Sequence, residues 1–141
     1  MLGLVIGEVL SEPETNDYRK GYQEGKAYMQ TKIVDGGLHI DHYGTKSWHQ
    51  DGKLHRTDGP AIEAADGTKE WWNDGLWHRT DGPAIEYPDG DESWYVDGER
   101  HREDGPAVNH ASSKEWYLNG QQYSEELFRI IQFNNGIKVN D

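Results

Sequence analysis

The chain of 141 residues contains no cysteine and only two phenylalanines and two methionines. Without cysteine it can form neither disulfide bonds nor cysteine-ligated zinc sites, which fits a reducing compartment. Hydrophobic residues of all kinds make up only 33% of the chain. One domain with a thin core is therefore expected at this length.

Long apolar runs are also missing. The apolar stretch "MLGLVIGEVL" covers only residues 1–10, whereas a membrane-spanning helix needs about twenty residues. It lacks the basic region of a signal peptide, and acids follow at Glu12 and Glu14. We expect this stretch to be a strand packed on the first repeat, and the protein to be cytoplasmic without a membrane partner.

Basic residues are scarce as well. Fourteen Lys and Arg stand against 26 Asp and Glu, and the formal net charge is -12. A protein that binds nucleic acid directly needs a basic footprint, and an anionic membrane surface attracts basic segments. The charge therefore argues against both kinds of partner.

Large aromatic residues are plentiful by contrast. Six tryptophans and eight tyrosines are present, and all six tryptophans lie between residues 48 and 116. Aromatic rings bury much apolar area per residue, and disordered chains contain few of them. The composition therefore indicates a folded chain whose core depends on these rings.

A phrase repeats at a fixed step. The letters "HRTDGPAIE" occur at 55–63 and again at 78–86, with variants near 35 and at 101. The aspartates of this series recur every 23 residues, at Asp35, Asp58, Asp81 and Asp104. Four units follow, 35–57, 58–80, 81–103 and 104–126, and the fourth lost one residue between Pro106 and Trp116. A period in this range is typical of repeat architectures.

One unit has the pattern of short strands joined by turns. In residues 58–80 the pair Asp-Gly occurs three times, and this pair suits tight hairpin turns. The pattern predicts strands at 60–65 and 68–73 and a short extended piece at 76–79. Because a lone hairpin is marginal in water, the units are expected to stack side by side. The predicted fold is mainly all-β, an elongated sheet of tandem β-hairpin repeats.

Each end of such a stack needs a cap. Residues 22–34 read as a degraded half-repeat, which makes 1–34 an N-terminal cap before the four repeats at 35–126. At 127–141 we expect a short capping helix and tail, with Ser124 as its N-cap and Gly136 near its end. The apolar residues at helical spacing that would cover the sheet end are Leu127, Ile130 and Ile131.

The unit pattern W-[YW]-x-[DN]-G-x-x-H-R-x-D-G-P-A resembles tandem 23-residue repeats of phage, large-virus and bacterial proteins. It is also similar to the MORN class, whose units form β-hairpins in an elongated sheet. The resemblance covers roughly residues 35–126 and the closing helix. It implies a scaffold with a partner-binding surface. The chain departs from MORN by carrying "HR-DGPA" in place of a glycine-rich stretch.

The histidines of the phrase raise the question of a metal site. If each unit adds two strands, equivalent histidines lie about 10 Å apart, whereas zinc ligands lie about 2 Å from one ion. We therefore expect no metal and no cofactor, and instead hydrogen bonds that tie unit to unit. The Trp series is likewise expected to pack the core, although an aromatic ladder could also stack sugars or choline groups. The residues assigned to the repeat scaffold are Trp48, Trp71, Trp94, Trp116, His55, His78, His101, Asp58, Asp81 and Asp104.

Positions that vary between units are the better candidates for a partner surface. Alternation along a strand places Trp71 and Trp72 on opposite faces, and we expect Trp72 to face outward. Exposed Trp and Tyr are typical interface anchors. The predicted partner-binding residues are Trp72, Trp77, Tyr87, Tyr95, Arg100 and Tyr117.

The sequence favours a protein that is not an enzyme. It contains no phosphate-binding loop, nucleophile elbow or zinc-protease helix, and no carboxylate pair is singled out for catalysis. We expect a protein that binds another protein, namely a host defence factor if it is phage-encoded. The acidic surplus would then imitate nucleic-acid phosphates. The alternatives are a ligand-binding module for glycan or choline groups and a structural part of a virion or larger assembly.

Overall fold

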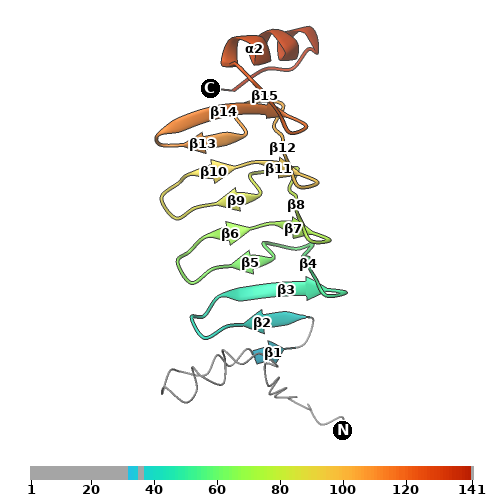
Figure 1. Ribbon diagram of the computed structural model, residues 1–141, viewed down its shortest axis with the longest axis vertical. Helices are drawn as coiled ribbons and strands as arrows, with labels where there is room; N and C mark the ends of the chain where they lie inside the picture. The colour runs from blue at the N-terminus through green and yellow to red at the C-terminus, as the bar shows by residue number, and fades with distance from the viewer. Residues whose placement is uncertain (1–31, 35–36, 141) are drawn as a thin grey trace, which may run out of the picture.

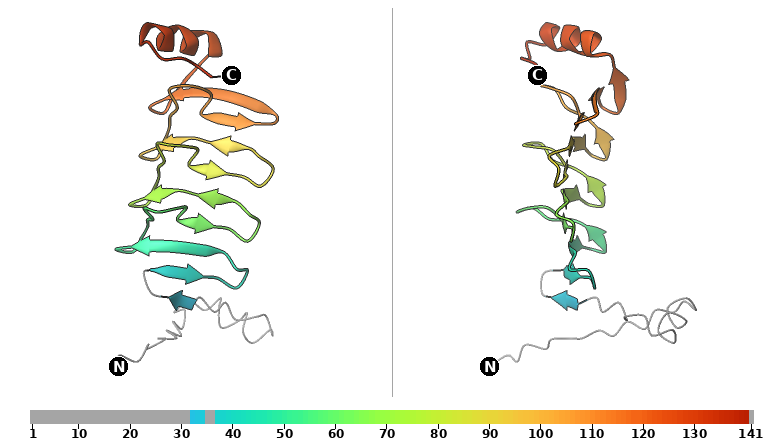
Figure 2. Two further views of the ribbon diagram at one scale, coloured as in Figure 1. Left: turned by 180° about the vertical axis from the view of Figure 1, so that it is seen from behind. Right: turned by 90° about the vertical axis from the view of Figure 1, so that its left-hand side faces the viewer.

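The computed structural model describes residues 32–34 and 37–140. The strand expected at 1–10 and most of the half-repeat at 22–34 lie outside this range. The described chain forms a column of stacked hairpins that runs from β1 (Lys32–Val34) at one end to helix α2 (Glu125–Asn134) at the other (Figure 1). The two further views in Figure 2 show the same narrow stack from behind and from the side.

Two hairpins, β7–β8 and β11–β12, form separate two-stranded sheets, and the other hairpins share one antiparallel sheet. Its order is β1-β2-β3-β5-β6-β9-β10-β13-β14-β15, and β4 pairs with β3 to complete an 11-stranded sheet. The mainly all-β fold predicted from the repeats is thereby confirmed. The remaining strands are β2 (Leu38–Ile40), β3 (Lys46–Gln50), β4 (Lys53–Leu54), β5 (Ile62–Glu63), β6 (Lys69–Glu70), β7 (Trp72–Asn73), β8 (Leu76–Trp77), β9 (Ile85–Glu86), β10 (Glu92–Ser93), β11 (Tyr95–Val96), β12 (Glu99–Arg100), β13 (Val108–His110), β14 (Ser113–Leu118) and β15 (Gln121–Tyr123).

Each middle unit contains two hairpins. In the unit 58–80, β5 and β6 form the first hairpin within the main sheet, and β7 and β8 form a second hairpin beside it. The turn of the second hairpin is Asp74-Gly75, with φ values of 49° and 83°. Two successive residues with positive φ define a type I′ turn, which Asp-Gly favours. The same turn recurs at Asp51-Gly52, Asp97-Gly98 and Asn119-Gly120.

The long strand predicted at 68–73 is interrupted at Trp71. The Trp71 N–H donates to the Ala84 carbonyl of the next unit, and its carbonyl accepts from the His78 N–H of its own unit. Its two backbone groups therefore bond in different hairpins, and the strand divides into β6 and β7. The strand predicted at 60–65 is likewise shorter, at β5, and the extended piece predicted at 76–79 contains the short strand β8.

The register gives the main sheet two different faces. On one face, Lys69 lies opposite both Glu63 and Glu86, so that charged side chains alternate along the stack. On the other face, Glu70 lies opposite both Ile62 and Ile85. Ile85 and Val108 are 6% and 2% exposed, and they form the core with the buried alanines of the repeat phrase, Ala61, Ala84 and Ala107.

Helix α2 closes the column, as predicted, but with a different face inward. Ser124 is its N-cap and accepts a hydrogen bond from the Leu127 N–H at 3.3 Å. The buried residues are Phe128 and Gln132, whereas Leu127 and Ile130 are 47% and 50% exposed. The expectation that Leu127 and Ile130 cover the sheet end was wrong. The buried Gln132 instead donates to the Glu103 carbonyl.

Candidate protein-binding surface

The Arg of the repeated phrase lies over the Trp of the same unit. In the unit 58–80, the guanidinium carbon of Arg79 is 3.9 Å from the centre of the Trp71 ring. Its Nε donates to Asp81 at 2.9 Å, and its Nη1 donates to Glu86 at 2.8 Å and to the Pro83 carbonyl at 3.1 Å. The same stacking recurs for Arg56 on Trp48 and Arg102 on Trp94.

This arrangement lowers the pKa of two aspartates that begin the next unit. Hydrogen bonds from Arg56 and Arg79 lower the pKa values of Asp58 and Asp81, respectively, below the ordinary range. Donation to the ionised form is the expected cause of such a shift. Asp104 receives the equivalent bond from Arg102 at 2.8 Å. The Trp of each of the first three units therefore contacts the Arg of the phrase, and this Arg bonds the Asp of the phrase.

The histidines of the phrase contact the turn of the following unit. His55 Nδ1 lies 3.1 Å from the Asp74 carboxylate, and His78 Nδ1 lies 2.8 Å from that of Asp97. His101 Nδ1 accepts from the Asn119 N–H at 3.0 Å. Each histidine thus joins two neighbouring units. In the part of the chain that the structure describes, no group of three or more His, Asp or Glu could hold a metal ion.

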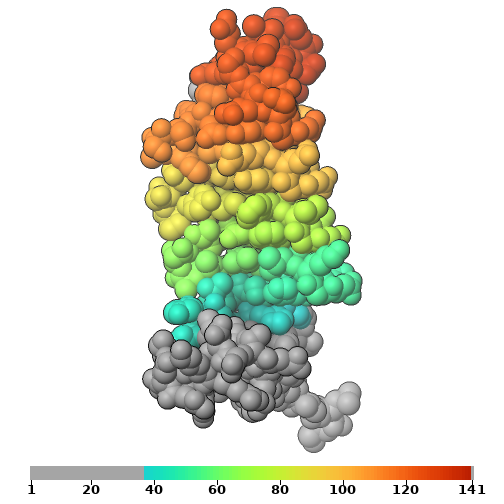
Figure 3. Space-filling view, viewed as in Figure 1, coloured from blue at the N-terminus to red at the C-terminus, as the bar shows by residue number. Residues whose placement is uncertain are grey.

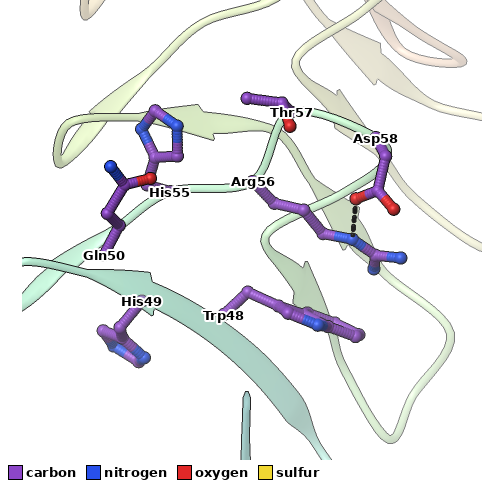
Figure 4. Close-up of a pocket in the computed structure, with 7 residues that line it drawn as sticks. All are labelled: Trp48, His49, Gln50, His55, Arg56, Thr57 and Asp58. Carbon is purple, nitrogen blue, oxygen red and sulfur yellow. Dashed lines mark hydrogen bonds and ion pairs between the residues drawn. The ribbon is translucent and has the colours of Figure 1, made fainter. Parts of the chain in front are cut away.

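A surface hollow of about 490 Å³ lies beside the first of these arrangements, lined by residues 48–50 and 55–58. Figure 4 shows the Arg56 side chain between Trp48 and Asp58, with the bond from Arg56 to Asp58 dashed. The Arg56 guanidinium and the Asp58 carboxylate, which both line the hollow, are thus already bonded to each other within the scaffold. The hollow is therefore a part of the repeat structure rather than the strongest candidate site.

The predicted partner residues are brought together on the second hairpins. Trp72 lies opposite Trp77 in the register, with ring centres 4.7 Å apart. The Trp77 ring lies 5.1 Å from that of Tyr95 in the next unit. Tyr95 in turn accepts from Arg100 at 3.2 Å, and Arg100 donates to the Tyr117 hydroxyl at 3.1 Å. We call this continuous row the aromatic stripe: Trp72, Trp77, Tyr95, Arg100 and Tyr117.

Two carboxylates lie within the stripe. Glu70 Oε2 accepts from the indole N–H groups of Trp72 and Trp77, at 3.0 and 2.8 Å. Glu115 Oε2 accepts from the Tyr117 hydroxyl at 2.9 Å and lies 3.4 Å from Arg100 Nη1. These bonds hold the polar edges of the rings in place. All five stripe side chains are half-buried, which leaves part of each side chain for a partner.

Tyr87 lies at the border of the stripe. It is 36% exposed, and its ring meets that of His110 edge-on at 5.7 Å. Burial raises the pKa of Tyr87 first, and the nearby Tyr95 and Glu70 raise it further. The structure therefore places all six predicted partner residues in one region. The pKa of Arg100 is also raised, chiefly by its hydrogen bond to Tyr95.

The turns at the margin of the stripe are acidic. The side chains of Asp74 and Asp97 are 69% and 75% exposed, and each sits at the tip of a hairpin that carries stripe residues. Glu99 on β12 is exposed as well. The stripe is therefore an aromatic surface with a negative border, which suits a partner with a basic surface.

Sequence reasoning missed Glu70 and Glu115. Each lies two residues before a stripe ring, Glu70 before Trp72 and Glu115 before Tyr117. Residues two apart on a strand share one face, so this spacing could have identified both. The overlooked His110 lacks such a signal, because its contact with Ser93 at 3.2 Å spans two units.

No family model matches this chain, and neither does any curated protein or any solved structure compared with it. Among residues 32–34 and 37–140, no helix combines the length and apolar character that crossing a membrane requires.

Proposed function

We propose that this chain is a non-catalytic protein that binds another protein through the aromatic stripe. The observation that supports this proposal is the continuous series of contacts from Trp72 through Trp77, Tyr95 and Arg100 to Tyr117. Interface hot spots are enriched in these residue types. Because the glutamates and neighbouring units hold the rings in place, little side-chain entropy is lost on binding.

The finer proposal concerns the partner. The resemblance to phage repeat proteins supports an inhibitor that acts in the host cytoplasm on a defence protein. The formal net charge of -12 and the exposed turn aspartates support imitation of nucleic-acid phosphates in a basic groove. Such a partner would be attracted over a distance and selected by charge.

The capture of a partner tests this function. Tagged protein is incubated with host lysate, and the retained protein is identified and its affinity measured. We expect Trp72→Ala and Trp77→Ala each to weaken binding by at least about 2 kcal/mol, the range of interface hot spots. The control is Tyr43→Ala, because Tyr43 is 69% exposed and lies outside the stripe.

Melting temperatures of the variants separate lost binding from lost folding. If folded Trp72→Ala and Trp77→Ala retain the partner as tightly as Tyr43→Ala, the stripe is not the binding surface. Nucleic-acid mimicry is tested separately, by measuring the affinity for the partner between 50 and 500 mM salt. Charge-driven binding weakens steeply with salt, so an affinity that stays constant would contradict mimicry while leaving aromatic docking intact.

A further inference from the structure

The repeats allow one part of the stripe to be compared with another. In the unit 58–80, Glu70 precedes Trp72 by two residues, and in the unit 104–126, Glu115 precedes Tyr117 by two residues. Glu70 lies opposite Ile62 and Ile85, and Glu115 lies opposite Val108, the repeat equivalent of Ile85. The two carboxylate–aromatic pairs therefore occupy equivalent places on one face.

The pair of the fourth unit holds an arginine. Arg100, from the unit before, lies with Nη1 3.4 Å from Glu115 Oε2 and 3.1 Å from the Tyr117 hydroxyl. Its guanidinium carbon is 5.1 Å from the centre of the Tyr117 ring. A carboxylate beside an aromatic face is a favourable setting for a guanidinium group. The chain thus contains an occupied example of arginine recognition.

The pair of the second unit lacks this arginine. The repeat equivalent of Arg100 in the unit before Glu70 is Leu54, since Leu54 pairs with His49 as Arg100 pairs with Tyr95. A leucine side chain has no donor to offer. Glu70 Oε2 accepts from both indoles. Its Oε1 has no hydrogen-bond partner among the described residues, and it is not one of the atoms sealed from solvent.

We propose that Glu70, with the indoles of Trp72 and Trp77, binds an arginine side chain presented by the partner protein. The inference rests on the proposed function and names the chemistry that the partner brings. Glu70 Oε1 accepts from the guanidinium, whose plane lies against the indole rings. The indole N–H groups hold the carboxylate in position beforehand, and the exposed Asp74 and Asp97 attract the cation.

Arginine fits this site better than lysine. The guanidinium is planar, stacks on aromatic rings and is weakly hydrated, whereas the ammonium of lysine is compact and strongly hydrated. A half-buried site lined by indoles removes hydration water, and this costs more for lysine. Arginine is also enriched in protein interfaces, which agrees with a protein partner.

Binding of blocked tripeptides tests the site directly. Acetyl-Gly-Arg-Gly-amide and its lysine counterpart are titrated at 150 mM salt, and the indole N–H resonances of Trp72 and Trp77 are followed by NMR. We expect the arginine peptide to shift both resonances to saturation, with a Kd at least about fivefold lower than that of the lysine peptide. Equal Kd values for the two peptides would overturn the proposal.

Two variants alter the site in opposite ways. Glu70→Gln removes the charge and should raise the Kd of the arginine peptide roughly tenfold, the effect of one charge-assisted hydrogen bond. Leu54→Arg supplies the internal arginine that Arg100 provides elsewhere, and it should abolish the response by filling the site. The matched controls are Glu92→Gln, on the opposite sheet face, and Gln50→Arg, at an exposed position.

If Glu70→Gln and Glu92→Gln weaken binding equally, the attraction is general and the arginine site is refuted. The same holds if Leu54→Arg binds the peptide as well as Gln50→Arg does. If Trp72→Ala loses the partner but the natural chain shows no response to the arginine peptide, the arginine site is refuted and the proposed function is retained. If the peptide response depends on Glu70 but no captured partner depends on the aromatic stripe, the arginine site is retained and the proposed function is refuted.

Discussion

Trp71 and Trp72 are adjacent tryptophans with different surroundings. Trp71 lies under the guanidinium of Arg79, whereas Trp72 lies against Trp77 and donates to Glu70. Side chains alternate between the faces of a strand, so the same residue serves the scaffold at one position and the stripe at the next. At the scale of the residue, the contacts of a side chain depend on the face it occupies as much as on its type.

The acid titration of Asp81 tests the Arg79 contact. Arg79 lowers the pKa of Asp81, so Arg79→Met should raise that pKa toward the ordinary value of about 3.9. Carboxyl NMR resonances followed between pH 2 and 6 measure the change. Asp66 is an internal control, because the Thr68 N–H, not an arginine, lowers its pKa. An Asp81 titration unchanged in Arg79→Met would contradict the contact.

The lowered pKa of Asp81 also determines the direction in which stability changes with pH. A carboxylate whose pKa is lower in the folded state stabilises the fold above its unfolded pKa, and this contribution is lost as the pH falls through the folded pKa. Stability should therefore decline below about pH 4. Asp81→Asn should show a smaller loss of melting temperature than the natural chain between pH 5 and pH 2.5.

At the scale of the element, helix α2 buries one face, and this face is not its most continuous apolar one. The helix could have turned Leu127 and Ile130 toward the sheet, since both are apolar. It instead buries Phe128, a larger ring, together with Gln132, whose side chain bonds the Glu103 carbonyl. The remaining phenylalanine, Phe133, is 82% exposed.

The two phenylalanines form a matched pair for a stability measurement. Phe128→Ala should lower the free energy of unfolding by about 3–5 kcal/mol, the cost of deleting a buried ring. Phe133→Ala should change it by less than about 0.5 kcal/mol, as is usual at the surface. Urea denaturation of both variants gives these values. Similar losses for both would show that the helix packs with another face inward.

At the scale of the whole molecule, the units stack through the same contacts each time. The turn glycines Gly75, Gly98 and Gly120 donate to carbonyls of the unit before, at 2.9 Å in each case. The space-filling view shows the units as successive bands that form one column (Figure 3). Such a chain behaves as a linear array of similar interfaces.

A whole unit should therefore be removable. Deletion of 81–103 joins Thr80 to Asp104 and keeps the phrase "HRTDGPA" intact. We expect a folded, less stable protein, shorter by about 10 Å because two strands of the main sheet, β9 and β10, are lost. Small-angle scattering and circular dichroism measure length and folding. Deletion of 81–92 is the control, because it does not remove a whole repeat, and it should unfold the chain. If the two deletions behave equally, the units do not stack through equivalent contacts.

The sequence by itself determined the 23-residue period, the Asp-Gly turns, the mainly β fold and the helix that starts after Ser124. These features follow from the backbone preferences of single residues and short phrases, which act locally. It also singled out Trp72, Trp77 and Arg100, because they break the repetition.

Only the tertiary structure decided what these residues touch. The bonds from both indoles to Glu70, and the reach of Arg100 to Glu115 in the next unit, depend on the register between hairpins. The burial of Phe128 and Gln132 in place of Ile130 depends on packing at the sheet end and on the bond from Gln132 to Glu103. A period specifies that units recur, whereas the contacts between units arise from side-chain lengths and rotations across the stack.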